Sequence, residues 1–197
     1  MFPSTDLQGL WENIWHELTS AVRDRQHPFR LPAVATVSPE GEPAVRTVVL
    51  RHVHSEQRRV DFYTDARSPK VKHLQHQPRA SWHFWDPSRQ VQIRLMTQVT
   101  LHRDGDAIAR QRWENCPMAS RLAYAKEIPP GQRMKDSTED RLPSLDDHPG
   151  EQKGQENFVV VMGSVDQIDF YEIMGHRHRR AQWSMTRAGI HGEWIAW

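Results

Sequence analysis

The strongest constraint on the fold is a succession of short, β-branched segments separated by turn residues. Segments 33–37 and 44–53 are joined by the turn sequence SPEGEP, which predicts a hairpin. Further strands are expected at 60–64, 81–85, 91–101 and 158–171. Only short helical stretches lie between them, which favours an antiparallel barrel over a doubly wound parallel sheet. We therefore expect a mainly β, α+β fold.

Helical periodicity is strongest near the beginning of the chain. Apolar residues recur there at three- and four-residue steps from Leu7 to Val22, and Ser4, Thr5 or Asp6 can cap the helix. A second, short helix is expected after Ser68, and DGDAIARQRWENC and PMASRLAYAKE also read as helical. Residues 128–155 are rich in proline, glycine and charge, which predicts a long loop. A length of 197 residues favours one domain, 1–197.

Composition narrows the classes of partner. Lys and Arg number 26 against 25 Asp and Glu, for a net charge of +1. This balance gives no general attraction to nucleic acid or to an anionic membrane, so any anion must be bound locally. The single cysteine, Cys116, excludes an internal disulfide and is typical of a reducing compartment. No apolar run approaches the length of a membrane span, so we expect a soluble, cytoplasmic protein.

The stretch VRTVVLRH contains two arginines within a strand-like segment. Strict alternation would place Arg46 on one face of the strand and Arg51 on the other. In a regular strand they are about 16 Å apart, on the order of the length of a small nucleotide cofactor. The alternative interpretation is a strand with solvated charged ends.

A second cationic stretch, YTDARSPK, combines Arg67, Ser68 and Lys70 at a predicted helix start. A helix N-terminus favours an anion, and the chain has no glycine-rich phosphate loop. Side chains and this helix N-terminus could therefore bind a phosphate. An ordinary capped surface helix is the alternative.

Two further polar stretches are candidate sites. In the strand at 91–101, aliphatic residues share one face, and the other is expected to carry Gln90, Gln92, Arg94 and Gln98 and to be wet or functional. The sequence HRHRRAQW contains a His-x-His pair, but its neighbouring arginines would repel a metal ion, so no metal site is expected.

Four motifs in order support a family resemblance: RTVVLRH, FYTDARSPK, HQPRASWHFW and RQVQIR. Their order resembles the pyridoxamine 5'-phosphate oxidase-like FMN-binding family, most clearly over residues 28–101. This resemblance implies a split β-barrel homodimer that holds one FMN in each of two clefts at the subunit interface.

The resemblance also implies roles for particular residues. Arg46, Arg67, Ser68 and Lys70 would bind the FMN phosphate. The main chain of Thr47, Val48, Val49 and Leu50 and the side chain of Gln90 would approach the flavin ring, with Arg51 in the same set. Tyr63 and Thr64 would line the cleft, and Arg180, or its neighbour Arg179, would contact FMN from the second subunit.

The substrate region departs from the oxidase pattern. In the oxidases, the helix after the barrel strands carries Tyr, Arg and Ser at four-residue steps, and these bind the substrate phosphate. Here the matching positions are Arg112, Cys116 and Ser120. Oxidation of vitamin B6 phosphates is therefore not expected, and the chain looks closer to a subgroup without a settled substrate.

Two classes of function follow from the sequence. The first is an FMN-dependent oxidoreductase with an altered substrate site, in which the flavin carries the chemistry. The second is a non-catalytic barrel that stores or senses flavin or binds another anion, haem or a deazaflavin. The sequence identifies neither a catalytic residue nor an electron donor or acceptor.

Overall fold

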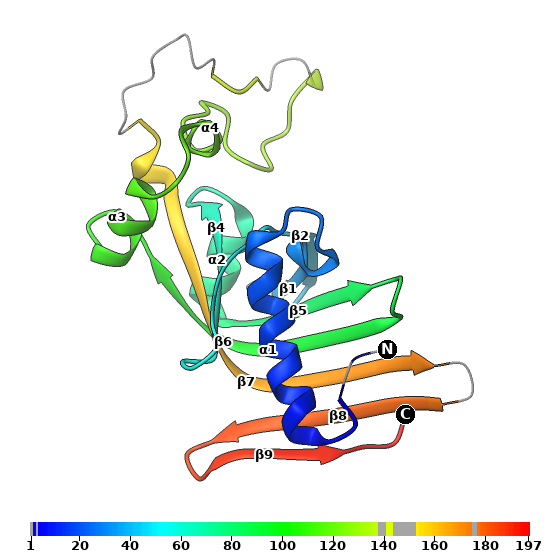
Figure 1. Ribbon diagram of the computed structural model, residues 1–197. Coiled ribbons are helices and arrows are strands. Elements are labelled where there is room, and N and C mark those ends of the chain that lie inside the picture. The colour runs from blue at the N-terminus through cyan, green and yellow to red at the C-terminus, as the bar shows by residue number, and fades with distance from the viewer. Residues whose placement is uncertain (1, 3, 138–140, 144–152, 175–176) are drawn as a thin grey trace.

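The computed structural model describes residues 2, 4–137, 141–143, 153–174 and 177–197 (Figure 1). Its strands form one sheet in the order β2-β1-β5-β6-β7-β4-β3. Strand β7 also pairs with β8, which in turn pairs with β9. Every pairing is antiparallel, as the sequence predicts. The strands are β1 (Ala33–Val37), β2 (Pro43–Thr47), β3 (Leu50–His54), β4 (Arg59–Asp65), β5 (Arg79–Asp86), β6 (Val91–His102), β7 (Phe158–Met174), β8 (Arg177–Thr186) and β9 (Gly189–Trp194).

The 17-residue strand β7 joins the two halves of the sheet. Its first half pairs with β4 and its second half with β8, while β6 runs alongside most of its length. A register shift between Met96 and Thr97 bends this long pairing. The sheet therefore divides at β7, with β4 and β3 diverging from β8 and β9 (Figure 1).

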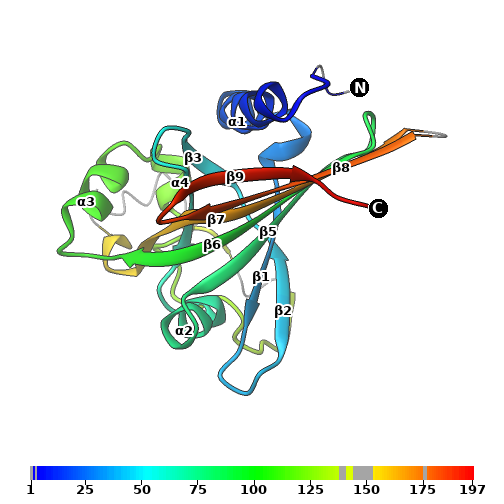
Figure 2. The same cartoon turned by 90° about the horizontal axis from the view of Figure 1, so that it is seen from below.

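Helices cover the apolar side of the strands. They are α1 (Leu7–Arg23), α2 (Pro69–His76), α3 (Ala107–Glu114) and α4 (Met118–Arg121), with 3-10 turns η1 (Pro28–Arg30) and η4 (Gln155–Asn157). Helix α1 buries Leu10, Ile14 and Leu18 in the main core, and Asp6 caps it by accepting a hydrogen bond from the Gly9 amide at 2.8 Å. Figure 2 shows α1 and α2 separated by the strands. None of the described helices is long and apolar enough to cross a membrane.

The first hairpin is confirmed, but the strand expected at 44–53 is wrong as a single element. Strand β2 ends at Thr47 and β3 begins at Leu50, and each pairs with a different neighbour. Between them, Val48 is buried and its amide donates to the Pro32 carbonyl at 3.0 Å. Four β-branched or aliphatic residues in a row, from Thr47 to Leu50, conceal this break because nothing in their composition marks a change of strand.

Two smaller expectations also need correction. The helix expected over PMASRLAYAKE is limited to the four residues of α4. Gln90 does not lie on the polar face of a strand; it occupies the turn between β5 and β6 with a φ of 53°. Of the long loop expected at 128–155, residues 138–140 and 144–152 lie outside the described part of the chain.

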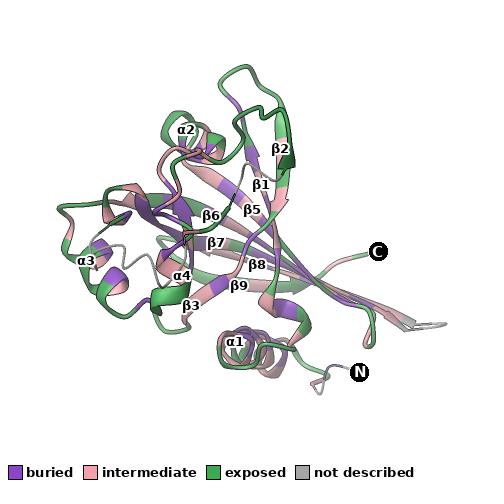
Figure 3. Ribbon diagram, turned by 90° about the horizontal axis from the view of Figure 1, so that it is seen from above, coloured by how far each residue is buried: buried purple, intermediate pink, exposed green. Residues whose placement is uncertain are grey.

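On β5 to β8, the face of the sheet that points away from the main core carries mainly polar residues. The registers align Ser81, Met96, Gln167 and Ser184 in one row across β5 to β8, beside a row of His83, Arg94, Asp169 and Gln182. A hollow of about 170 Å³ opens on this face. The edge strands β2 and β9 are also largely exposed (Figure 3). Gln92 and Arg94 lie on this face, as the strand alternation predicts.

Candidate functional site

Arg46 is held at the open edge of the first hairpin. It lies on β2 opposite Val34, and its side chain turns back over β1. There Nη1 donates to the Val34 carbonyl at 3.1 Å and to Thr36 Oγ1 at 2.8 Å. The remaining guanidinium nitrogens have no protein acceptor among the described residues, so they can bind a ligand.

Lys70 lies in the first turn of α2, and within the described part of the chain its ammonium group donates to hydroxyl groups alone. Its Nζ donates to Ser68 Oγ at 2.6 Å and to Thr64 Oγ1 at 3.1 Å. Both hydroxyl residues are buried. Because α2 follows β4 directly, this short turn places Thr64, Ser68 and Lys70 together.

Arg46 and Lys70 are two partly buried cations that lack a counter-ion in the described part of the chain. Burial lowers the pKa of Arg46. The pKa of Lys70 is also lowered, chiefly by burial and further by the positive charge of Arg46. Neither cation forms an ion pair with a carboxylate in the described part of the chain. Two partly buried cations that repel each other are best stabilised by an anion. We call these two residues the cation pair.

The N-terminus of α2 adds donors to the cation pair. Ser68 occupies the N-cap position but makes no side-chain capping bond. By contrast, Asp6 caps α1 and Asp106 caps α3, the latter by accepting from the Ile108 amide at 2.7 Å. Pro69 has no N–H and the Val71 amide donates to the Ser68 carbonyl at 2.9 Å, so this end offers an anion mainly the Lys70 amide and the positive end of the helix dipole. A phosphate group fits this donor set.

Arg67, also predicted for the phosphate, has a different environment. Its Nη2 and Nε donate to the two carboxylate oxygens of Asp65 at 2.7 and 3.0 Å, and its Nη1 to the Glu127 carbonyl at 3.3 Å. Asp65 therefore already neutralises Arg67. It lies near the start of α2, but its charge is less available than those of the cation pair.

The segment expected to approach the flavin ring forms the junction between β2 and β3. Thr47 is exposed, Val49 is half-buried and lies outside both strand pairings, and Leu50 is fully buried. This junction follows Arg46 directly. Its main chain therefore begins beside Arg46, and its approach to the flavin ring stays a prediction.

Tyr63 and Arg51 belong to an adjoining polar group. The Arg51 guanidinium lies 5.5 Å from the centroid of the Tyr63 ring, and Tyr63 Oη is 2.7 Å from His52 Nε2. Burial lowers the pKa of His52 to about 4 and raises that of Tyr63 to about 12, so both are neutral at neutral pH. Sequence reasoning missed His52.

Sequence reasoning also missed Thr36 and His73, which contact each other at 3.0 Å beside Arg46. A signal for Thr36 was present: it occupies an inward-facing position of the apolar strand AVATV. A buried hydroxyl in such a strand requires a hydrogen-bond partner.

Gln90 is not brought to the cation pair within one chain. Gln90 lies in the turn that follows the last residue of β5, whereas α2 precedes the first residue of this strand. The two ends of β5 are seven residues apart, which corresponds to about 23 Å of strand. Its carbonyl accepts a hydrogen bond from the Ile173 amide at 3.0 Å. Its assignment to the flavin remains a prediction that needs a second chain.

The two candidate arginines of β8 point to opposite faces of the sheet. Arg180 binds Asp169 at 2.8 Å on the open face, where Arg94 binds the same carboxylate at 3.0 Å. Arg179 instead binds the fully buried Glu172 and the carbonyls of Phe2 and Ser4. We call the Arg179–Glu172 pair with this N-terminal segment the N-terminal clamp. Arg180 therefore lies on the open face and Arg179 does not, and the contact of Arg180 with the FMN of a second subunit stays a prediction.

The altered substrate positions are largely enclosed. Arg112 lies 3.5 Å from the carboxylate of Asp61, which is fully buried, and 3.2 Å from His54 Nε2. Burial raises the pKa of Cys116, which keeps its thiol protonated. Neither position supplies a free cation in this arrangement.

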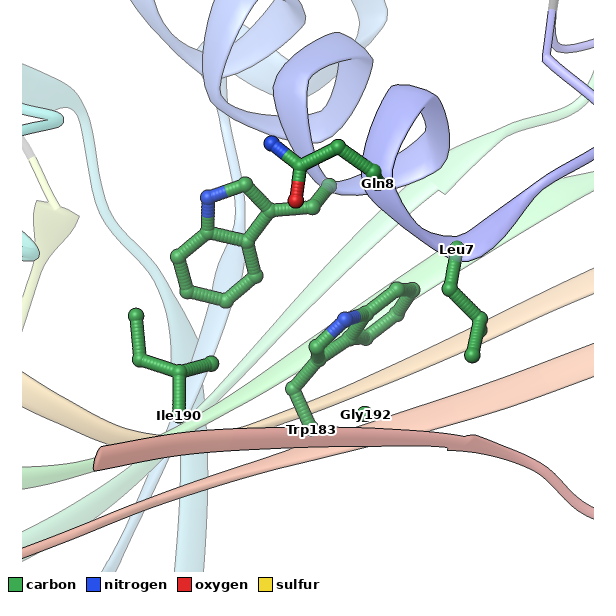
Figure 4. A pocket seen from close by; sticks show the side chains of 6 residues that line it. Leu7, Gln8, Trp183, Ile190 and Gly192 are labelled. Atoms are coloured by element: carbon green, nitrogen blue, oxygen red, sulfur yellow. The ribbon is translucent and has the colours of Figure 1, made fainter. Parts of the chain in front are cut away.

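A separate hollow of about 280 Å³ lies between α1 and the β8–β9 hairpin (Figure 4). The indoles of Trp11 and Trp183 lie 6.1 Å apart there, with Ile190 at the rim. None of the described residues that line it is charged. It is unsuited to a phosphate.

Comparison with known proteins agrees with this geometry. A model of the pyridoxamine 5'-phosphate oxidase FMN-binding domain matches residues 10–103. A pyridoxine/pyridoxamine 5'-phosphate oxidase of Bacteroides fragilis is 38% identical over 93 residues, 45% of this chain and 36% of its own. That of Thermosynechococcus vestitus is 31% identical over 137 residues, 68% of this chain and 62% of its own. The chain thus matches only part of the length of these relatives.

Solved structures extend the likeness over the whole fold. A pyridoxamine 5'-phosphate oxidase-related, FMN-binding protein from Nostoc punctiforme has a TM-score of 0.77 and 25% identity, covering 98% of this chain and 99% of its own. PhzG from Burkholderia lata, solved with tetrahydrophenazine-1-carboxylic acid, has a TM-score of 0.71 at 17% identity, covering 98% and 93%; it shows the fold alone. In fold, motif order and sequence, the chain is therefore similar to the pyridoxamine 5'-phosphate oxidase-like family of FMN-binding split barrels.

Proposed function

We propose that this protein is an FMN-dependent oxidoreductase. The observation that carries the proposal is the cation pair, Arg46 and Lys70, which has no carboxylate partner among the described residues and lies beside an uncapped helix N-terminus. A phosphate dianion would satisfy both charges and would lie at the positive end of the helix dipole. The bound flavin would supply the hydride chemistry, and the protein would position it.

The proposed site is completed by a second copy of the chain. The sheet face with Arg94, Asp169 and Arg180 is open in one chain, and Gln90 is about 23 Å of strand away from α2. A homodimer packed through this face would bury its half-exposed polar rows, and it could bring Gln90 and Arg180 to the partner's flavin. A cytoplasmic location agrees with the reduced single cysteine.

The proposed substrate is not a vitamin B6 phosphate. A substrate phosphate in a partly desolvated cleft needs its own cation. Arg112 is already engaged by Asp61 and His54, and Cys116 is a buried neutral thiol. We therefore expect a substrate that does not depend on a phosphate bound by this helix.

The first experiment is reconstitution of the purified protein with FMN. We expect a yellow protein with a flavin absorbance band, one FMN per chain, and a dimer in sedimentation at micromolar concentration. A colourless protein that cannot be reconstituted would refute the flavin assignment. A flavoprotein whose bound FMN is reduced by no donor would favour a flavin store or sensor.

The second experiment is a steady-state assay under air with pyridoxine and pyridoxamine 5'-phosphates. Little or no turnover is expected, because the phosphate would lack a free cationic partner. Turnover with micromolar Michaelis constants would show that the altered positions do not exclude these substrates.

A further inference from the structure

We propose that Thr36 and His73 are positioning residues that direct Arg46 towards the ligand phosphate. The inference rests on the proposed FMN site and adds two residues that do not themselves contact the flavin. Thr36 Oγ1 would accept a hydrogen bond from Arg46 and donate its own proton to His73 Nδ1.

The three side chains come from three different elements. Arg46 lies on β2, Thr36 on β1 and His73 on α2. Arg46 Nη1 is 2.8 Å from Thr36 Oγ1, which is 3.0 Å from His73 Nδ1. Thr36 is only 3% exposed, so water does not replace either partner. The chain of bonds therefore links the hairpin edge to the helix that carries Lys70.

The guanidinium fixes the direction of the first bond in this chain, and the proposal assigns that of the second. A guanidinium can only donate, so the Thr36 oxygen is the acceptor towards Arg46. The single hydroxyl proton of Thr36 is then free to be donated to His73 Nδ1. This requires the neutral imidazole to carry its proton on Nε2.

A neutral positioning group suits a ligand-binding arginine. Arg67, Arg179 and Arg180 are each oriented by a carboxylate, which also cancels their charge. Thr36 orients Arg46 without cancelling its charge. The full positive charge then remains available to an anion beside Lys70.

The test compares FMN with riboflavin, which lacks only the phosphate. Dissociation constants of both ligands would be measured by quenching of flavin fluorescence, and their ratio isolates the phosphate contribution. We expect the wild-type protein to prefer FMN by about a hundredfold or more, as two charge-assisted hydrogen bonds would give. Thr36→Val keeps the side-chain shape, and it should lower this preference by about tenfold.

Matched variants separate positioning from structure. Thr36→Ser and His73→Asn retain the hydrogen-bonding groups, and both should keep most of the preference. His73→Leu should lower it, whereas His76→Leu, an exposed control on the same helix, should not.

The outcomes distinguish a failure of the phosphate site from a failure of the positioning role alone. If the wild-type protein does not prefer FMN over riboflavin, the phosphate site and the proposed function are both wrong. If Arg46→Met removes the preference but Thr36→Val and His73→Leu do not, only the positioning role is refuted. Equal weakening of both ligands in Thr36→Val would also refute it, because that result indicates a structural role.

Discussion

The cation pair and the N-terminal clamp both hold positive charge partly away from water, but their partners differ. In the clamp, Arg179 donates to Glu172, which is fully buried and also accepts from the Phe2 amide at 2.8 Å. In the cation pair, Arg46 and Lys70 donate to hydroxyl and carbonyl groups only.

This difference separates charges that hold the fold together from charges available for binding. A cation neutralised by a buried carboxylate has no remaining attraction for an anion, but removing either partner leaves an isolated charge. A cation solvated by neutral groups weakens the empty protein slightly and gains most when an anion arrives. The same contrast distinguishes Arg46 from Arg67, although both were predicted for the phosphate.

The largest effect is expected from breaking the clamp. Glu172→Gln keeps the size of the side chain but leaves Arg179 without its counter-ion, and should lower the free energy of unfolding by about 3 kcal/mol. Urea denaturation would measure the loss. Asp166→Asn is the control, since its pair with Arg79 is solvent-exposed and should contribute less than about 1 kcal/mol. Equal losses in the free energy of unfolding would show that the clamp stabilises the fold no more than an exposed ion pair does.

The opposite pattern is expected at the start of α2. Arg67→Ala combined with Lys70→Ala should weaken FMN binding strongly and leave the fold intact, because neither side chain belongs to the apolar core. Of the single variants, Lys70→Ala should cause most of the loss, since Asp65 already neutralises Arg67. Fluorescence titration with FMN and circular dichroism would check both points. Unchanged FMN affinity in the double variant would rule out this phosphate site.

The smallest effect concerns pH. The pKa of Lys70 lies below its ordinary value of 10.5, chiefly through burial. Between the lowered pKa and 10.5 the unfolded chain therefore binds a proton that the folded chain lacks, so Lys70 makes stability rise with pH across this window. Lys70→Met should flatten that rise in the FMN-free protein, measured by urea denaturation at several pH values. A slope identical to that of the wild-type protein would show that Lys70 is not under electrostatic strain.

The sequence predicted the members of the cation pair but not what surrounds them. Ser68 and Lys70 were recognisable because N-cap and first-turn positions are local features. Thr36 and His73 were not, because their contacts with Arg46 depend on the packing of α2 against β1. The pairing of Arg67 with Asp65, two residues away, was visible in the sequence but could not be distinguished from a free cation.

Most of the fold was predictable for similar reasons. The hairpin at SPEGEP, the capped helix α1 and the antiparallel pattern follow from turn residues and periodicity. The break at Val48 and Val49 was missed because it lies within an unbroken β-branched run, where only the pairing partners change. Gln90 was misplaced because alternation cannot locate the residue at which a turn ends.

The central position of β7 has a consequence for how the protein is made. Among the described strands, β4, which carries Tyr63 and Thr64, pairs with β3 and with residues 158–164 of β7 alone. During synthesis, about a hundred further residues must leave the ribosome before β4 can form its second ladder. The nascent chain therefore exposes an unpaired apolar strand for much of its translation, a state that is prone to aggregation. Yield in a cell should depend on chaperones that shield this segment until β7 emerges.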